Sequence, residues 1–385
     1  MKKTRTVPFA VYPLIWPLRN DVVEASVAQT GGMLGPVVFH LPNGHSVSPL
    51  AVAPWTGEVL PEGLPPLLNT LRGDFFCAPF GGNGTAFRGE SHPPHGESAN
   101  KAWTLDATTH AGDAITLHAH LVTRVRKGRI DKRLTLREGH TAVYCEHVMQ
   151  GFSGDMPIGT HPCVQFPNRE GAGRISVGNW RWGQVLPMDL EKPEDGGYTA
   201  LKIGSRFRSL RRVALARGGW TDLSRYPARK GYEDLVMLVG SGKGDFGWTA
   251  VTFPDEGFAL IQIKNPRVLQ HTVLWHSNGG RHYAPWNGRH VNVLGLEEVT
   301  SYFHLGLAES VRANPLSKAG IPTSVKLSPR RPLRVATILV VVAIPAKFDE
   351  VASLRAVDGG MEVTALSGKS VKAPIDLSFV QSESV

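Results

Sequence analysis

Apolar and polar residues alternate with a period of two along much of this chain. In the segment 115–121 every second residue is Ile, Leu or Ala, and the residues between them are Thr or His. The segment 143–149 carries apolar or aromatic residues on both of its sides, and the segments 259–264, 268–275 and 291–296 continue the series. A period of two is typical of β-strands, whose successive side chains point to opposite faces. The sequence therefore predicts a protein built almost wholly from strands.

Signals for other elements are sparse and lead to one fold class. Only the segment 301–312 has a pattern that predicts a helix, and Pro315 limits it. Asp358-Gly-Gly and Ser367-Gly-Lys predict turns between late strands. Strands and helices do not alternate, and we find neither a linker nor the blade-length repeat of a six-bladed propeller. We therefore expect an all-β protein, a large antiparallel β-sandwich formed as a single domain by residues 1–385.

Composition changes this picture only slightly. The 42 glycines and 28 prolines are spread along the chain, which suits many short strands joined by turns. The net charge of +9 raises the question of whether the protein binds nucleic acid. Its densest basic stretches, 124–137 and 206–217, are interleaved with apolar residues, and no zinc-finger spacing, basic helix or RNA-binding aromatic signature accompanies them. We expect no nucleic-acid partner, whereas an anionic or phosphorylated sugar remains an open alternative as the ligand.

The chain gives no sign of membrane insertion or secretion. An apolar run from Val7 to Leu18 is broken by three prolines and followed at once by charged residues, without a cleavage site. The run 336–344 is too short to span a bilayer and predicts a buried strand. The cysteines number three and form no CxxC pair, which favours buried thiols in a reducing compartment. We expect a cytoplasmic protein without a membrane partner.

Three segments place proton-competent side chains beside Gly or Pro, which fix the backbone. They contain His95-Gly96, His161-Pro162 and, in the segment 293–300, Glu297. An imidazole titrates near neutral pH and can act as an acid, and a carboxylate can accept a proton from a hydroxyl group. These residues would suffice for a proton shuttle. Taken singly, however, each is as readily explained as a hydrogen-bonded histidine or a surface carboxylate.

The order of these segments resembles the aldose 1-epimerase, or galactose mutarotase-like, superfamily. The landmarks are Pro79-Phe-Gly-Gly-Asn83, His95-Gly96, Thr160-His161-Pro162 and Leu296-Glu297. A further stretch, Gly244-Asp-Phe-Gly-Trp-Thr-Ala-Val-Thr-Phe-Pro254, is similar to the one that precedes the strand before the family's glutamate. No single motif is specific; the ordered set, which spans residues 79–297, carries the resemblance.

The resemblance implies a β-supersandwich that binds a small sugar on its concave face and interconverts its α and β anomers without a metal or an organic cofactor. By analogy Glu297 is the base that removes the anomeric proton, His161 is the acid that protonates the ring oxygen, and His95 holds and polarises the sugar. Asn83 and Asp245 would contact sugar hydroxyl groups.

The sequence departs from the family pattern after Asn83. The basic residue usual there is replaced by Gly84, and Arg72 or Arg88 is the candidate to take its place. Trp275 could supply an aromatic plate for the C–H face of a pyranose, or could be a core residue.

Other functions stay open at this level. A protein that only binds sugars could keep the fold without the chemistry, and a lyase or hydrolase would need a further acidic pair, for which Glu90, Asp245 and Glu298 are available. His118 and His120 share one strand face, a spacing that a metal could use, but no third ligand is evident and a polar strand face is the simpler interpretation. The identity of the sugar and the oligomeric state are not encoded in these patterns.

Overall fold

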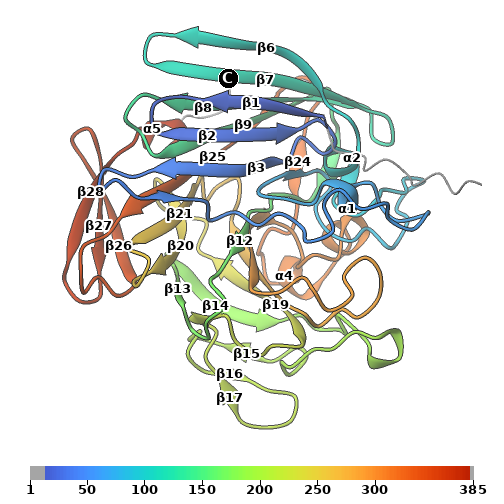
Figure 1. Ribbon diagram of the computed structural model, residues 1–385. Helices are drawn as coiled ribbons and strands as arrows, with labels where there is room; N and C mark the ends of the chain where they lie inside the picture. The colour runs from blue at the N-terminus through green and yellow to red at the C-terminus, as the bar shows by residue number, and fades with distance from the viewer. Residues whose placement is uncertain (1–13, 382–385) are drawn as a thin grey trace, which may run out of the picture.

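The computed structural model describes residues 14–381 and contains two large antiparallel sheets (Figure 1). The predicted all-β, antiparallel sandwich architecture is confirmed. The apolar run from Val7 to Leu18 lies partly outside the described residues, and its last part belongs to strand β1. Among the described residues, no helix has both the length and the apolar character needed to cross a bilayer.

The first large sheet has eight strands. Its order is β15 (Arg206–Phe207), β14 (Trp180–Val185), β19 (Tyr232–Gly240), β22 (His271–Asn278), β23 (Val293–Thr300), β11 (Ile158–Thr160) and β5 (Phe76–Cys77), with β12 (Cys163–Gln165) paired to β23. Strands β22 and β23 lie at its centre and are buried along their whole length. Side chains on both of their faces are therefore shielded from water.

The second large sheet has nine strands. Its order is β18 (Arg225–Tyr226), β13 (Gly173–Val177), β20 (Gly247–Phe253), β21 (Phe258–Lys264), β25 (Leu333–Ala343), β9 (Ala142–Gln150), β8 (Gly128–Arg137), β7 (Ala114–Thr123) and β6 (Thr104–Ala111). The predicted strands at 115–121, 143–149 and 336–344 are β7, β9 and part of β25. At its edge, β6 is exposed on both faces and has a bulge between Leu105 and Ala107 (top of Figure 1).

Smaller sheets complete the fold. They are β1 (Ile15–Arg19), β2 (Val23–Ala28), β3 (Leu34–His40) and β4 (Ser46–Val47); β10 (Gly154–Met156) with β24 (Val325–Leu327); β16 (Val213–Ala214) with β17 (Trp220–Thr221); and β26 (Val351–Val357), β27 (Gly360–Ala365) and β28 (Ser370–Pro374). The turns predicted at 358–360 and 367–369 join the strands of the last sheet.

Helices are short. The prediction of a single helix at 301–312 is wrong in number: α3 (Leu307–Val311) lies inside that segment, and α1 (Leu67–Thr70), α2 (Gly96–Asn100), α4 (Pro315–Lys318), α5 (Ser378–Gln381) and the 3-10 turn η1 (Pro193–Asp195) accompany it. Each has five residues or fewer, too few for the 3.6-residue period to become visible in a sequence.

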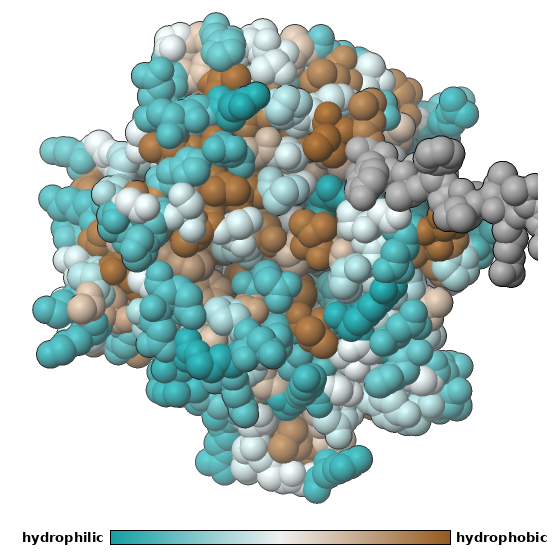
Figure 2. All heavy atoms as spheres, viewed as in Figure 1, coloured by the Kyte–Doolittle hydropathy of each residue, from teal (hydrophilic) through white to brown (hydrophobic). Residues whose placement is uncertain are grey.

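Three apolar clusters define the layers. The largest lies between the two large sheets and includes Leu134 of β8 and Leu296 of β23. The second covers the other face of the eight-stranded sheet and joins Trp275 of β22 to Leu68 of α1. The third joins the nine-stranded sheet to β26–β28, on the left of Figure 1. Over the face shown in Figure 2, apolar side chains gather in small groups among polar ones.

Candidate active site

A cavity of about 230 Å³ lies where α1 and the neighbouring loops pack over the eight-stranded sheet. Its wall combines apolar residues with a few groups that can exchange protons. The lining residues are Pro65, Leu67, Leu68, Leu71, Phe75, Gly82, Pro94, His95, His161, Leu190, Leu235, Trp275, Arg281, Trp286, Glu297 and His304. The volume is below the roughly 300–1,000 Å³ of common ligand pockets, so the cavity suits a small molecule.

Glu297 and His161 form a close pair in this cavity. Nε2 of His161 lies 3.2 Å from Oε1 of Glu297, and both side chains are almost fully buried. The other carboxylate oxygen, Oε2, is buried and has no hydrogen-bond partner in the described structure. Buried polar atoms without partners are rare in folded proteins, so Oε2 is a candidate contact for a ligand.

The local sequence explains how the pair is placed. Glu297 lies in β23, where odd-numbered residues face the cavity layer and even-numbered residues face the core between the sheets. A Cβ at Gly295, two residues earlier, would lie 2.7 Å from Oε1 of Glu297, so only glycine leaves room for this carboxylate. His161 follows β11, and its backbone N–H donates to the carbonyl of Phe75 at 3.0 Å. Its ring stacks on that of Phe75 with centroids 4.6 Å apart.

His95 meets the pair from a loop. Its ring centroid lies 5.0 Å from that of His161, edge to face. The residue has a left-handed backbone (φ 59°) just before α2, and a Cβ at the following Gly96 would lie 2.1 Å from the carbonyl oxygen of Ala78. The close approach of the two segments therefore requires the glycine at position 96. Nδ1 of His95 is buried and has no hydrogen-bond partner among the described residues.

Burial dominates the electrostatics of these groups. It raises the pKa of Glu297 well above its usual range, and it lowers the pKa of His161 to about 3 and that of His95 further below its ordinary value. Desolvation disfavours the charged form of both acids and bases. Burial therefore favours the neutral carboxyl form of Glu297 and the neutral imidazole form of His161.

Arg281 is a site residue that sequence reasoning missed. It lines the cavity with its guanidinium 4.5 Å above the ring of Trp286, and its Nε donates to Oε1 of Glu191 at 2.6 Å. Burial opposes its charge, but the carboxylates of Glu233 and Glu191 raise its pKa. Arg281 directly follows Asn278-Gly-Gly, after a segment that predicts a buried strand. A basic residue beside glycines at the end of such a strand was the sequence feature that could have marked it as a site residue.

Trp275 lies in the cavity wall, where it is only 6% exposed. Its Nε1 donates to Glu233 at 2.9 Å, and its ring stacks on His290 with centroids 5.5 Å apart. Burial raises the pKa of Glu233 to about 7. Trp275 thus belongs to the apolar core and to the cavity surface at once, which unites the two interpretations left open above.

His304 also lines the cavity and was missed. Burial lowers its pKa to about 4, and its Nδ1 has no hydrogen-bond partner in the described structure. It falls in the segment 301–312, which the sequence predicted to be a helix, but α3 begins only at Leu307. The helical pattern therefore gave no sign that His304 lies in a loop. Its carbonyl oxygen accepts a hydrogen bond from the backbone N–H of Gly82 at 2.6 Å, which ties it to the Pro79–Asn83 loop.

Two predicted contact residues, Asn83 and Arg72, are absent from the described lining of the cavity. The side chain of Asn83 donates to the carbonyls of Pro79, Gly81 and Pro93 and accepts from the backbone N–H of Leu307 at 2.9 Å. Arg72 is 5% exposed and its Nε donates to the carbonyl of Thr70. Asn83 uses its amide to hold the loops together, so its placement favours a positioning role.

The remaining carboxylates of interest lie elsewhere. Asp245 is exposed in the loop before β20, and Glu90 is paired with Arg126. Glu298 points into the core between the two large sheets, where Lys264 contacts it directly. None of the three belongs to the described lining of the cavity. The acidic pair that a hydrolase would need is therefore not supplied by these residues.

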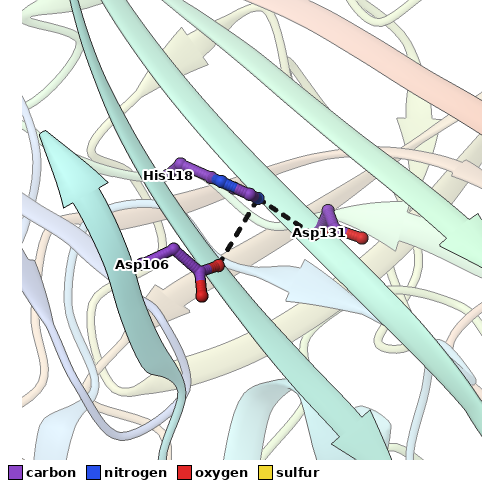
Figure 3. A group of neighbouring side chains, drawn as sticks. All are labelled: Asp106, His118 and Asp131. Atoms are coloured by element: carbon purple, nitrogen blue, oxygen red, sulfur yellow. Dashed lines mark hydrogen bonds and ion pairs between the residues drawn. The ribbon is translucent and has the colours of Figure 1, made fainter. Parts of the chain in front are cut away.

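A possible metal site lies on the nine-stranded sheet. Asp106 of β6, His118 of β7 and Asp131 of β8 offer ligand atoms within 4.8 Å of one another, so this group contains His118 but not His120, the other histidine considered from the sequence (Figure 3). Arg129, however, already binds Asp131 at 2.7 Å. Burial opposes it, but the hydrogen bonds from Arg129 and His118 lower the pKa of Asp131 to about 2. The group is therefore explained as a network of ion pairs and hydrogen bonds within the chain, in which Arg129 balances the charge of Asp131.

Comparisons by sequence give no match: neither a protein-family model nor a curated protein matches this chain. Solved structures do match. A candidate aldose 1-epimerase from Escherichia coli K12 has a TM-score of 0.57 at 13% identity, covering 86% of this chain and 99% of that one. A galactose mutarotase-related enzyme from Lactobacillus acidophilus has a TM-score of 0.54 at 10% identity, with coverage of 88% and 100%.

A galactose mutarotase-like protein from Clostridium acetobutylicum gives a similar result, with a TM-score of 0.54 at 11% identity and coverage of 86% and 99%. Identities this low establish a shared architecture and leave the activity to be argued from the site. The chain therefore has the galactose mutarotase-like β-sandwich fold.

Proposed function

We propose that this protein is an aldose 1-epimerase, which interconverts the α and β anomers of a small sugar in the cavity described above. The observation that carries the proposal is the pair of His161 and Glu297, 3.2 Å apart in the wall of this cavity, with one buried carboxylate oxygen that has no hydrogen-bond partner in the described structure. Proton transfer needs groups within hydrogen-bond reach of the substrate. The anomeric hydroxyl and the ring oxygen of a pyranose are bonded to the same carbon, so two neighbouring groups suit the two transfers.

The chemistry needs one proton on the pair. A sugar hydroxyl that donates to Oε2 of Glu297 favours the carboxylate form and moves the shared proton to His161. Glu297 then accepts the proton of the anomeric hydroxyl while His161 gives its proton to the ring oxygen. The bond between C1 and the ring oxygen breaks and a C1 carbonyl forms. Rotation about the C1–C2 bond and the reverse transfers close the other anomer.

Neighbouring groups hold the substrate. His95, whose Nδ1 has no hydrogen-bond partner among the described residues, is suited to bind a sugar hydroxyl next to His161. The Trp275 ring offers an apolar surface for the C–H face of a pyranose. The three cysteines are buried and free, which suits a reducing compartment such as the cytoplasm.

The direct test is a mutarotation assay, by polarimetry or NMR exchange, on a panel of aldoses and hexose phosphates. Glu297→Gln keeps the shape of the side chain but cannot accept the proton. We expect its kcat to fall by roughly a hundred- to ten-thousand-fold while sugar affinity changes little, because the interaction matters mainly in the transition state. His161→Asn should behave alike, and His95→Asn should weaken binding and rate together.

The outcome also separates an enzyme from a sugar-binding protein. Binding of an aldose without any catalysed mutarotation by the wild type would replace the proposal with a binding function. An unchanged rate in Glu297→Gln would remove Glu297 from the mechanism.

A further inference from the structure

The wall of the active-site cavity has two unlike parts. The groups that can exchange protons, Glu297, His161 and His95, come from β23, the end of β11 and the loop before α2. A different segment, 65–71, which includes α1, adds only apolar side chains. A ligand that fills the cavity therefore meets polar partners on one part of its surface and hydrocarbon on another.

The apolar part is held firmly in place. Leu67, Leu68 and Leu71 are 6%, 9% and 4% exposed and belong to the same apolar cluster as Trp275. The backbone N–H of Leu67 donates to Oδ1 of Asn100 at 3.1 Å, and the carbonyl of Leu68 accepts from Nε1 of Trp55 at 2.7 Å. With its backbone fixed at two points, this segment cannot readily turn polar groups toward a ligand.

The hydrogen-bonding side chains that line the cavity in the described chain, Glu297, His95, His161, His304, Arg281 and the two tryptophans, all lie outside the segment 65–71. Among the lining residues of the described chain there is no Asn, Asp, Gln, Ser or Thr side chain. Arg281 is engaged by Glu191, which also accepts from the hydroxyl of Tyr283 at 2.9 Å. A fully hydroxylated hexose carries hydroxyl groups around its whole ring, and a buried hydroxyl without a partner is unfavourable.

The charge balance points to an uncharged ligand. Arg281 is the sole Lys or Arg among the lining residues in the described part of the chain, and it is already balanced by Glu191 and lies close to Glu233. Burial lowers the pKa of His95, His161 and His304, which keeps these rings neutral near pH 7. A phosphate group would enter without a free cation to meet it.

We propose that the preferred substrate is an uncharged deoxy sugar, a pyranose with a methyl group in place of a hydroxymethyl group, and that this methyl group packs against Leu67, Leu68 and Leu71. The proposal rests on the epimerase function proposed above and names its substrate class. A methyl group makes apolar contacts with Leu67, Leu68 and Leu71. A hydroxymethyl group at the same place finds no hydrogen-bond partner for its hydroxyl group among these three side chains.

The test compares sugars that differ by one oxygen atom. D-Fucose and D-galactose form one such pair, and L-rhamnose and L-mannose form another. We expect kcat/KM for catalysed mutarotation, measured by NMR exchange, to be roughly ten- to a hundred-fold higher for the 6-deoxy member of at least one pair. Equal or higher values for the hydroxylated member of both pairs would overturn the proposal while leaving the epimerase function in place.

Leu68→Asn links the preference to the wall, because it puts a hydrogen-bonding amide where the methyl group would lie. We expect the deoxy preference to shrink toward equality in this variant. Leu64→Asn is the matched control, since Leu64 packs against the same cluster but is not among the described lining residues, and it should keep the wild-type preference. An unchanged preference in a folded Leu68→Asn variant would contradict the assignment of this wall.

A binding measurement keeps the two proposals apart. If no sugar is turned over but NMR titration finds tighter binding of the deoxy member, the substrate class stands and the catalytic proposal fails. If neither member of either pair is turned over or bound, both proposals fail.

Discussion

Two neighbouring glutamates in β23 have opposite surroundings. Glu297 faces the cavity, where burial raises its pKa and Oε2 has no hydrogen-bond partner among the described residues. Glu298 faces the core between the sheets and accepts hydrogen bonds from Thr249 at 2.6 Å and Thr272 at 2.7 Å, beside its contact with Lys264. The strand pleat alone separates a group available to a ligand from one committed to the fold.

We predict a crossed pattern for the two Glu-to-Gln substitutions. Glu298→Gln leaves the Lys264 charge buried without its partner, so the free energy of unfolding should fall by roughly 3–5 kcal/mol. Glu297→Gln removes a carboxyl group whose charged form is disfavoured by burial, so stability at pH 7 should stay within about 1 kcal/mol of wild type or rise. Urea unfolding of both variants, beside the mutarotation assay, checks the pattern.

Glu298→Gln is also the matched control for Glu297→Gln in the mutarotation assay, because Glu298 faces the core between the sheets. We expect its activity per folded molecule to stay close to that of the wild type even though its stability falls. Loss of mutarotation in folded Glu298→Gln with full activity in Glu297→Gln would mean that the base is the other residue.

At the scale of elements, Asn83 joins three segments. Its side chain binds the Pro79–Asn83 loop, the carbonyl of Pro93 before His95, and the backbone N–H of Leu307 at the start of α3. A Cβ at Gly306 would lie 2.6 Å from its Oδ1, so the fit is close. The amide thus sets the position of the loop that carries His95.

We expect Asn83→Ala to lower stability by roughly 2 kcal/mol and to weaken sugar binding and rate together, because the loop that positions His95 loses its hydrogen bonds. Urea unfolding and a KM-against-kcat comparison test this. The conservative variant Asn83→Ser keeps one hydrogen-bond acceptor, so we expect its stability and sugar binding to lie between those of Asn83→Ala and the wild type. A variant with wild-type stability but lost binding would instead support direct contact of Asn83 with the sugar.

Strands could be predicted from the sequence because their signal is local. The alternation at 115–121 reflects one buried and one open face of β7, which a short window of residues already contains. The order of His95, His161 and Glu297 identified cavity residues through a resemblance to a family. Their roles, and the single-domain organisation, stay predictions.

Other site residues could not be predicted because long-range packing places them. Arg281 and His304 reach the cavity only through the course of their loops, and both lie next to residues that looked like turns or helix. Asp245 and Arg72 were chosen by analogy, yet Asp245 lies exposed in a loop and Arg72 is held by the carbonyl of Thr70. Residue type alone does not distinguish Arg281 and His304, which line the cavity, from Asp245 and Arg72, which do not.

At the scale of the whole molecule, burial keeps several histidines neutral, both in strands and in the segments that join them. Burial lowers the pKa of His161 and His290 to about 3 and that of His271 and His304 to about 4. It also lowers the pKa of His147 well below its ordinary value, and neither ring nitrogen of that residue has a partner in the described structure. In the unfolded chain these rings would titrate near pH 6.5.

Stability should therefore fall as the pH falls. Between about pH 6.5 and the lowered pKa values, the unfolded state binds more protons than the folded state, so each such histidine costs up to about 1.4 kcal/mol per pH unit. We expect the urea midpoint to drop steeply between pH 6.5 and pH 4.5. His147→Leu should flatten this slope without large loss of stability at pH 7, and a midpoint independent of pH in the wild type would contradict the prediction.

The exposed strand β6 has a consequence for how copies of this protein meet. An edge strand that is open on both faces offers unpaired backbone groups to any other extended chain, which is how sheets of separate molecules join and aggregate. Here the bulge at Asp106 interrupts the regular pairing of β6 with β7. Oδ1 of Asp106 lies within hydrogen-bond distance of Nδ1 of His120, at 2.8 Å. A kinked, charged edge is a poor template for another strand. The bulge and the charged side chains around Asp106 therefore disfavour pairing of β6 with a strand of a second copy of this protein.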